Sequence, residues 1–256
     1  MRTRLTGLLI LVLTALTLAA CDNGNDHVLQ GWVEAELIFV SPDEQGRVEA
    51  LKVREGDHVK KGDVLFTVDD DLQKADVVVR NTAVVNAQQS FDRAKELLKS
   101  AAGTQKTYED AEATLRQANA NLEWSQTRLM RRNAYSPGDA TVEQIYYRPG
   151  ETVPAGRPVV ALLPPSNLKF RFFAPQGVLP EIKIGETVGV SCDGCEKGLT
   201  AKVSFIARSA EFTPPVIYSL EERAKLVFLI EARPEQPEKF RVGQPVTITL
   251  PQEPRK

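Results

Sequence analysis

The spacing of hydrophobic residues predicts a helical hairpin in the middle of the chain. Over residues 77–129 apolar side chains recur three and four positions apart, which is the a/d pattern of two packed helices. The first arm carries Val77, Arg80, Val84, Ala87, Phe91, Ala94, Leu98 and Ala101, and the second carries Tyr108, Ala111, Leu115, Ala118, Leu122, Ser125 and Leu129. We predict an antiparallel hairpin over 70–135, with arms of about 30 residues that are roughly 45 Å long.

A short break separates the two arms at the predicted tip. It reads Ala102-Gly103-Thr104, in which the glycine is typical of a helix stop and the threonine of an N-cap.

The segments on either side of the hairpin are two copies of one β pattern. Residues 48–65 (VEALKVREGDHVKKGDVL) align with 142–159 (VEQIYYRPGETVPAGRPV) at a constant offset of 94 without gaps. The alignment matches Gly56 with Gly150 and places turn glycines between short apolar strands. The pattern predicts one β module whose halves are separated by the helical insertion.

The remaining sequence is β in character. Strand patterns occur at 168–174, 184–190, 201–207, 224–232 and 245–250, with Gly, Pro and Asp clusters between them. Together they predict a small antiparallel β-barrel over 165–251.

The repeated half-motif resembles that of biotinyl and lipoyl domains, in which two halves close into a flattened β-sandwich. Carrier domains place their modified lysine at the turn between the halves, whereas here the hairpin occupies that junction. Lys52 and Lys74 flank the region, but neither lies in a carrier-type turn. The resemblance therefore implies the fold without a cofactor.

A helical hairpin between two half-lipoyl motifs resembles the periplasmic adaptor, or membrane fusion protein, family (HlyD- and AcrA-like). This implies an elongated, modular fold of mixed α and β structure, with a split sandwich over 41–69 and 136–164. It also implies that a strand within 31–40 joins the β-barrel over 165–251, because the chain of the family passes through the barrel before it enters the sandwich. It also implies an inner-membrane transporter and a TolC-like outer-membrane channel as partners, and a ring of identical copies, commonly a hexamer. The run at 211–232 resembles a segment of adaptors that serve ABC-type exporters.

The predicted tip carries an adaptor motif. Members that engage TolC-type channels share R-x3-L-x6-(S/T), and Arg93, Leu97 and Thr104 have this spacing. The resemblance implies channel docking by these three residues. The alternative is structural, with Leu97 beside the seam, Arg93 a solvated arginine and Thr104 only an N-cap.

The N-terminus predicts secretion and a lipid anchor. Arg2 and Arg4 precede an apolar run over 8–20, which is shorter than a membrane span. The run ends Leu-Ala-Ala-Cys, which resembles a bacterial lipobox, so residues 1–20 are the predicted signal peptide and Cys21 the lipidated residue. Asp22 resembles the signal for retention in the inner membrane of a Gram-negative cell, facing the periplasm. We predict a linker over 21–30; an ordinary signal peptide is the alternative.

Cys192 and Cys195 form a C-x-x-C that allows a structural disulfide, free thiols, or a redox or metal site. Asp-Gly between them and strand patterns on both sides favour a disulfide across a turn, which the periplasm permits. A redox or metal-handling protein is one rival function, and an adaptor-like protein with another hairpin partner is a second.

The sequence carries no enzyme motif, and predicts neither a metal site nor a cofactor. The net charge of −2 does not favour nucleic acid as a partner, and residues 252–256 are a predicted tail.

Overall fold

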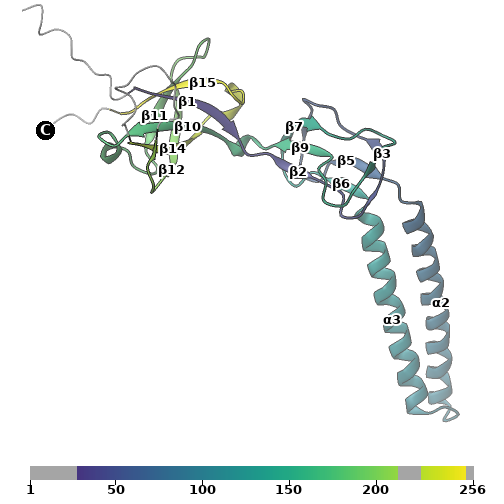
Figure 1. The fold of residues 1–256 in the computed structure, drawn as a ribbon. Helices are drawn as coiled ribbons and strands as arrows, with labels where there is room; N and C mark the ends of the chain where they lie inside the picture. Colours follow the sequence, from purple (N-terminus) through teal and green to yellow (C-terminus); the bar gives the residue numbers. More distant parts are fainter. Residues whose placement is uncertain (1–27, 213–225, 252–256) are drawn as a thin grey trace, which may run out of the picture. The chain divides into compact units, whose positions relative to one another are not determined.

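The computed structural model describes residues 28–212 and 226–251, and these form two compact units (Figure 1). The barrel unit comprises 28–34 and the described residues from 168 onward, and the hairpin unit comprises 35–167. The predicted signal peptide, Cys21, most of the linker, part of the 211–232 run and the predicted tail lie outside the described residues. No helix in the described part of the chain is long and apolar enough to span a membrane.

Six strands close the barrel unit. Their order is β10 (Leu168–Pro175), β1 (Val28–Ala35), β15 (Pro245–Thr249), β11 (Thr187–Ser191), β12 (Leu199–Ile206) and β14 (Leu226–Pro234), and β14 pairs back onto β10. The two-residue β13 (Glu211–Phe212) adds to the edge of β14, and two short 3-10 turns, η3 (Leu179–Glu181) and η4 (Pro237–Lys239), lie in the connections. Alternate residues of β10 are buried, and the ring of Phe170 meets Phe240 edge-on at 4.7 Å between centroids. The alternation gives the closed sheet one apolar interior face.

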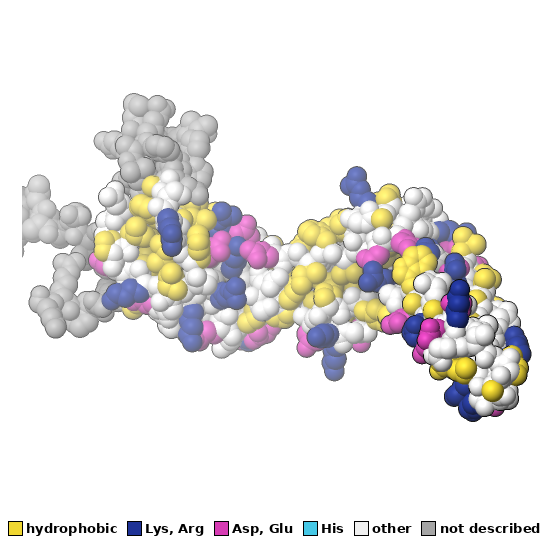
Figure 2. Space-filling view, turned by 90° about the horizontal axis from the view of Figure 1, so that it is seen from below, with side chains coloured by type: hydrophobic (Ala, Val, Ile, Leu, Met, Phe, Trp, Pro, Cys, Tyr) yellow, Lys and Arg dark blue, Asp and Glu magenta, His cyan; other side chains and the backbone are white. Residues whose placement is uncertain are grey.

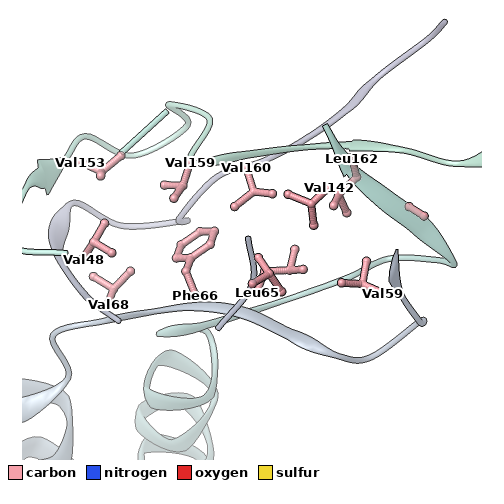
Figure 3. Packing of buried hydrophobic residues seen from close by; sticks show 12 residues of the cluster. Val48, Val59, Leu65, Phe66, Val68, Val142, Val153, Val159, Val160 and Leu162 are labelled. Carbon is pink, nitrogen blue, oxygen red and sulfur yellow. The ribbon is translucent and has the colours of Figure 1, made fainter. Parts of the chain in front are cut away.

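Two four-stranded sheets form the sandwich of the hairpin unit. One sheet has the order β2 (Ile38–Val40), β9 (Val160–Leu163), β7 (Ala140–Ile145) and β4 (His58–Val59). The other has the order β6 (Asn133–Tyr135), β5 (Val64–Val68), β3 (Gly46–Leu51) and β8 (Thr152–Val153). Residues from both repeat copies fill the space between them, including Val48, Leu65, Phe66, Val142 and Leu162 (Figure 3).

The repeat in the sequence is a repeat of hydrogen bonds in the structure. The Gly56 N–H donates to the Val142 carbonyl at 2.8 Å, and the Gly150 N–H donates to the Val48 carbonyl at the same distance. Both glycines have a positive φ, of 90° and 94°, which a side chain disfavours. Each half thus donates a hydrogen bond to a strand carbonyl of the other half. The two halves therefore form one module, although about 70 residues separate them in sequence.

The inserted helices are α2 (Asp71–Lys99) and α3 (Gln105–Met130), and they pack side by side (Figure 1). The predicted seam is confirmed, because its helical members are buried or half-buried, with Ala87 and Ser125 the most buried. Ala101 is the exception, since α2 ends before it. In the space-filling view, charged side chains of both signs are scattered over the surface, and hydrophobic side chains reach it in patches (Figure 2).

Three boundaries differ from the sequence prediction. The first strand begins at Val28, inside the segment predicted as linker. Residues 38–40, assigned to the barrel from sequence, form β2 and pair with β9 of the sandwich. Residues 133–135, assigned to the hairpin, form β6 and pair with β5. The last two have one cause, because β2 and β6 are equivalent edge strands of the repeat and are too short to show an alternating pattern.

Candidate functional site at the hairpin tip

The backbone of the tip is closed by hydrogen bonds to one carbonyl. The Leu97 carbonyl accepts from the N–H groups of Ala102 at 2.9 Å and Gly103 at 3.0 Å, and from the Ser100 hydroxyl at 3.1 Å. The residue in the left-handed conformation is Ala101, with φ of 55°, and not Gly103, which the sequence favoured as the helix stop. Gly103 instead permits close packing, since a Cβ there would lie 3.1 Å from the Leu97 Cβ.

Replacing Ala101 with glycine is expected to stabilise the tip. An L-residue in the left-handed conformation is disfavoured by about 1–2 kcal/mol, and part of this gain is offset by the greater backbone freedom of glycine in the unfolded chain. We therefore expect slower hydrogen exchange at the amides of residues 102 and 103. Ala102→Gly is the matched control, because residue 102 has no positive φ and should gain nothing. Faster exchange in Ala101→Gly would contradict the expectation.

The motif side chains lie at this tip. Leu97 is 50% exposed, whereas its neighbour Leu98 is half-buried in the seam. Arg93, one turn before Leu97, is exposed and donates from Nη2 to the Ser90 hydroxyl at 3.0 Å. Thr104 is the N-cap of α3, and its Oγ1 accepts from the Thr107 N–H at 3.1 Å. The motif thus combines an exposed leucine and arginine on α2 with a threonine that begins α3.

Contacts between the two helices fix the height of the tip. The rings of Phe91 and Tyr108 lie 5.3 Å apart just below it. Nearer the sandwich, the buried Ser125 hydroxyl donates to the Asp76 carboxylate at 2.8 Å. This hydrogen bond, with the charge of Arg80 nearby, lowers the pKa of Asp76. Arg80 was the one charged seam residue in the sequence, and its ion pair with Asp76 at 3.2 Å accounts for it.

Arginines at the end of α3 attach the hairpin to the sandwich. Arg128 forms a two-pronged ion pair with Glu44, at 2.8 and 2.9 Å, and lies over the Trp124 ring at 4.8 Å. The hydrogen bond from Arg128 lowers the pKa of Glu44. Arg132 is 8% exposed and donates to the carbonyls of Asp69 and Gln45. These residues were not predicted from the sequence, although the arginine cluster at 128–132 is visible there.

The two cysteines lie in the connection between β11 and β12, and the structure pairs them as a disulfide. The Cys195 N–H donates to the Cys192 carbonyl at 3.1 Å, and Gly194 has a positive φ, as a tight turn requires. Gln244 points its Nε2 at both sulfurs, at 3.2 and 3.5 Å, and its backbone carbonyl accepts from the Val33 N–H. These contacts favour a structural role, which stays a prediction. Nowhere in residues 28–212 or 226–251 do three or more potential metal ligands come together.

Relatives found by sequence include proteins described as UPF0194 membrane proteins. No family model matches the chain. A UPF0194 membrane protein of Citrobacter koseri is 29% identical, with 91% of each chain covered. A UPF0194 membrane protein of Acidithiobacillus ferridurans is 24% identical over 87% of this chain and 86% of its own. The 36 kDa antigen of Helicobacter pylori is 23% identical over 88% of this chain and 89% of its own.

The fold is shared with solved structures, among them a membrane fusion protein. A MacA–MexA chimeric protein that contains the Pseudomonas aeruginosa MexA α-hairpin domain superposes with a TM-score of 0.69, at 22% identity over 87% of this chain and 79% of its own. The membrane fusion protein Spr0693 of Streptococcus pneumoniae superposes with a TM-score of 0.67, at 18% identity over 89% of this chain and 99% of its own. The chain therefore has the fold of periplasmic adaptor, or membrane fusion, proteins, as its sequence predicts, and it is related in sequence to the UPF0194 membrane proteins.

Proposed function

We propose that this chain is the adaptor subunit of a tripartite efflux or secretion system. It would link an inner-membrane transporter, for which we favour the ABC type, to a TolC-like outer-membrane channel. The observation that carries the proposal is the exposed Leu97 at the tip of the hairpin. The solved adaptor structures support the fold on which the proposal is built.

Leu97 can contact a partner without disturbing the packing of the two helices. The seam is filled by Leu98, so burying Leu97 in a channel groove would add a favourable contact without opening the two helices. Full burial of a leucine side chain is worth about 1.5–3 kcal/mol, and half of that area is exposed here. Arg93 is exposed one turn away and has guanidinium N–H groups left to donate after its bond to Ser90.

The remaining modules serve as spacer and anchor in this proposal. Helix α2 has 29 residues, so the hairpin reaches roughly 45 Å from the sandwich. We propose that Cys21 carries lipid and holds the chain at the periplasmic face of the inner membrane of a Gram-negative cell. We further propose that copies assemble as a ring, with six subunits favoured, and that the protein performs no chemistry of its own.

Photo-crosslinking in cells tests the docking step. A photoreactive residue at Leu97 is expected to yield a product that contains a TolC-like outer-membrane protein. The same residue at Gln117, which is exposed lower on α3, is the control and should yield none. Arg93→Ala should abolish the Leu97 product while leaving the protein folded, because the Arg93 side chain is exposed and its hydrogen bond goes to the hydroxyl of the exposed Ser90.

Other outcomes would point elsewhere. Absence of an outer-membrane product from Leu97, with an inner-membrane transporter still co-purifying, would contradict channel docking and favour an adaptor with another hairpin partner. Loss of transport on replacing Cys192 and Cys195 with serine in a folded protein would favour the redox or metal-handling alternative.

A further inference from the structure

A tight turn of one design recurs in both units of the chain. Its first N–H donates to the side chain of its fourth residue, and the N–H of the fourth residue donates back to the first carbonyl. The third residue is a glycine with φ of 80–94°, which a side chain disfavours, whereas the second residue, at the apex, meets no such restriction. Turns of this design are 54–57, 60–63 and 148–151 in the sandwich, and 183–186 and 241–244 in the barrel unit.

The apex residue differs in chemistry between the two units. In the sandwich the apex is Glu55, Lys61 or Pro149, whereas in the barrel unit it is Ile184 or Val242. The side chain of Ile184 is 69% exposed and that of Val242 is 49% exposed. Because the same turn forms around a glutamate and around a lysine, its folding does not require an apolar apex. The two barrel turns are also a matched pair, since each exposes an aliphatic side chain from the same position.

The two barrel turns lie at opposite ends of the closed sheet. Turn 183–186 precedes β11, and turn 241–244 precedes β15. Strands β1 and β11 are both antiparallel to β15, and Val28 lies in one row with Gly189 because each pairs with Thr249. Turn 183–186 therefore shares its end of the barrel with the start of β1, whereas turn 241–244 lies at the other end.

The proposed lipid anchor ties the first of these ends to the membrane. Six residues separate Cys21 from Val28, and seven residue steps extend over at most about 25 Å. The end of the barrel at which β1 starts is thus held within about 25 Å of the lipid that Cys21 carries. This tether selects a lipid surface as the neighbour of turn 183–186.

A second exposed apolar side chain lies at the same end. The Gly185 N–H donates to the Val203 carbonyl at 2.8 Å, so turn 183–186 is attached to β12. Strand β12 runs toward this end of the barrel, and Phe205, two residues beyond Val203, is 47% exposed. Ile184 and Phe205 therefore supply two large apolar side chains from adjacent segments.

We propose that turn 183–186 contacts the bilayer, with the Ile184 side chain inserted at the boundary between headgroups and acyl chains. This inference rests on the lipid anchor of the proposed function and adds a second point of membrane contact on the folded barrel. An aliphatic side chain at that boundary leaves water, while the polar backbone of the turn stays among the headgroups. A tether alone limits distance, and a second contact also restricts the orientation of the barrel on the membrane.

Photo-crosslinking of the full-length protein in vesicles of phosphatidylethanolamine and phosphatidylglycerol tests the contact. A photoreactive residue at Ile184 should capture phospholipid at least tenfold more often than one at Val242. A photoreactive residue at Phe205 should also capture phospholipid, and Ile184→Lys should lower that yield about fivefold to thirtyfold, because the side chain that leaves water is lost. Val242→Lys is the matched control and should leave the yield unchanged. Both lysine variants should fold, since Lys61 occupies the apex of turn 60–63.

Other outcomes would overturn the proposal. These are equal capture of phospholipid from positions 184 and 242, an unchanged Phe205 yield in Ile184→Lys, and capture in cells of a transporter protein in place of phospholipid from position 184. Mass spectrometry of the N-terminal peptide reports the anchor separately. A lipid on Cys21 without a phospholipid adduct at position 184 would refute this contact alone, whereas an unmodified Cys21 would refute the anchor and the contact with it. Crosslinking from Leu97 to an outer-membrane channel is read independently of both, so failure of this contact leaves the docking step standing.

Discussion

Replacing Phe66 with alanine is expected to lower the free energy of unfolding of the hairpin unit by about 3–5 kcal/mol. Phe66 is 0% exposed and lies between the two sheets, where side chains of both repeat halves meet it (Figure 3). The equivalent residue of the other half is Val160, which is smaller and also 0% exposed. The repeat therefore supplies no second ring at this position that could fill the space left by Phe66. Removing the ring loses its burial and leaves a cavity.

Urea unfolding followed by circular dichroism at the helical band measures this loss, because the helices of the hairpin are continuous with the sandwich strands. Phe39→Ala is the matched control on the neighbouring sheet. Its ring is 53% exposed, so we expect a loss of less than about 1 kcal/mol. Equal losses for the two variants would show that Phe66 is not the centre of this core.

The periodic parts of the structure could be predicted from the sequence. The three-and-four spacing places Ala87 and Ser125 at the buried seam, and the turn glycines Gly56 and Gly150 have the positive φ that their positions in the repeat indicate. These features depend on local spacing, which the sequence displays directly. The β character of the segments on either side of the hairpin was predictable for the same reason, whereas the split sandwich was predicted from the resemblance to biotinyl and lipoyl domains.

Features that depend on tertiary pairing could not be predicted. Strands β2 and β6 have three residues each, and only their partners β9 and β5 make them strands. Ala101 adopts the left-handed conformation because the surrounding hydrogen bonds to Leu97 hold it there, against its own preference. For the candidate site, the resemblance to the adaptor motif selected Arg93, Leu97 and Thr104, and the helix N-cap predicted at Thr104 is confirmed by the hydrogen bond that its hydroxyl accepts from the Thr107 N–H.

The attachment of the hairpin was also not predicted from the sequence, and it leads to the second large effect. Arg132→Ala is expected to destabilise the hairpin unit by about 2–3 kcal/mol, in the range for hydrogen bonds to a charged group that is largely buried. Its guanidinium donates to the Asp69 carbonyl from Nε at 2.9 Å and from Nη2 at 2.7 Å, and to the Gln45 carbonyl at 3.3 Å. Gly46 leaves room for it, since a Cβ there would lie 3.0 Å from Nη2.

Arg131→Ala separates this role from that of a surface arginine. Arg131 is the adjacent residue, but its side chain is 63% exposed and its ion pair with Asp43 spans 3.4 Å, so its loss should change stability by less than about 1 kcal/mol. Arg132→Lys should recover only part of the loss, because an ammonium cannot reproduce the planar fork that reaches two carbonyls. Urea unfolding ranks the three variants by stability. The rate of hydrogen exchange at the Val68 amide, which donates to the Arg132 carbonyl, measures local opening where the hairpin joins the sandwich. If Arg131→Ala and Arg132→Ala were equally mild, the root of the hairpin would be held by packing and by the Arg128–Glu44 pair instead, and the tip would be positioned without this arginine.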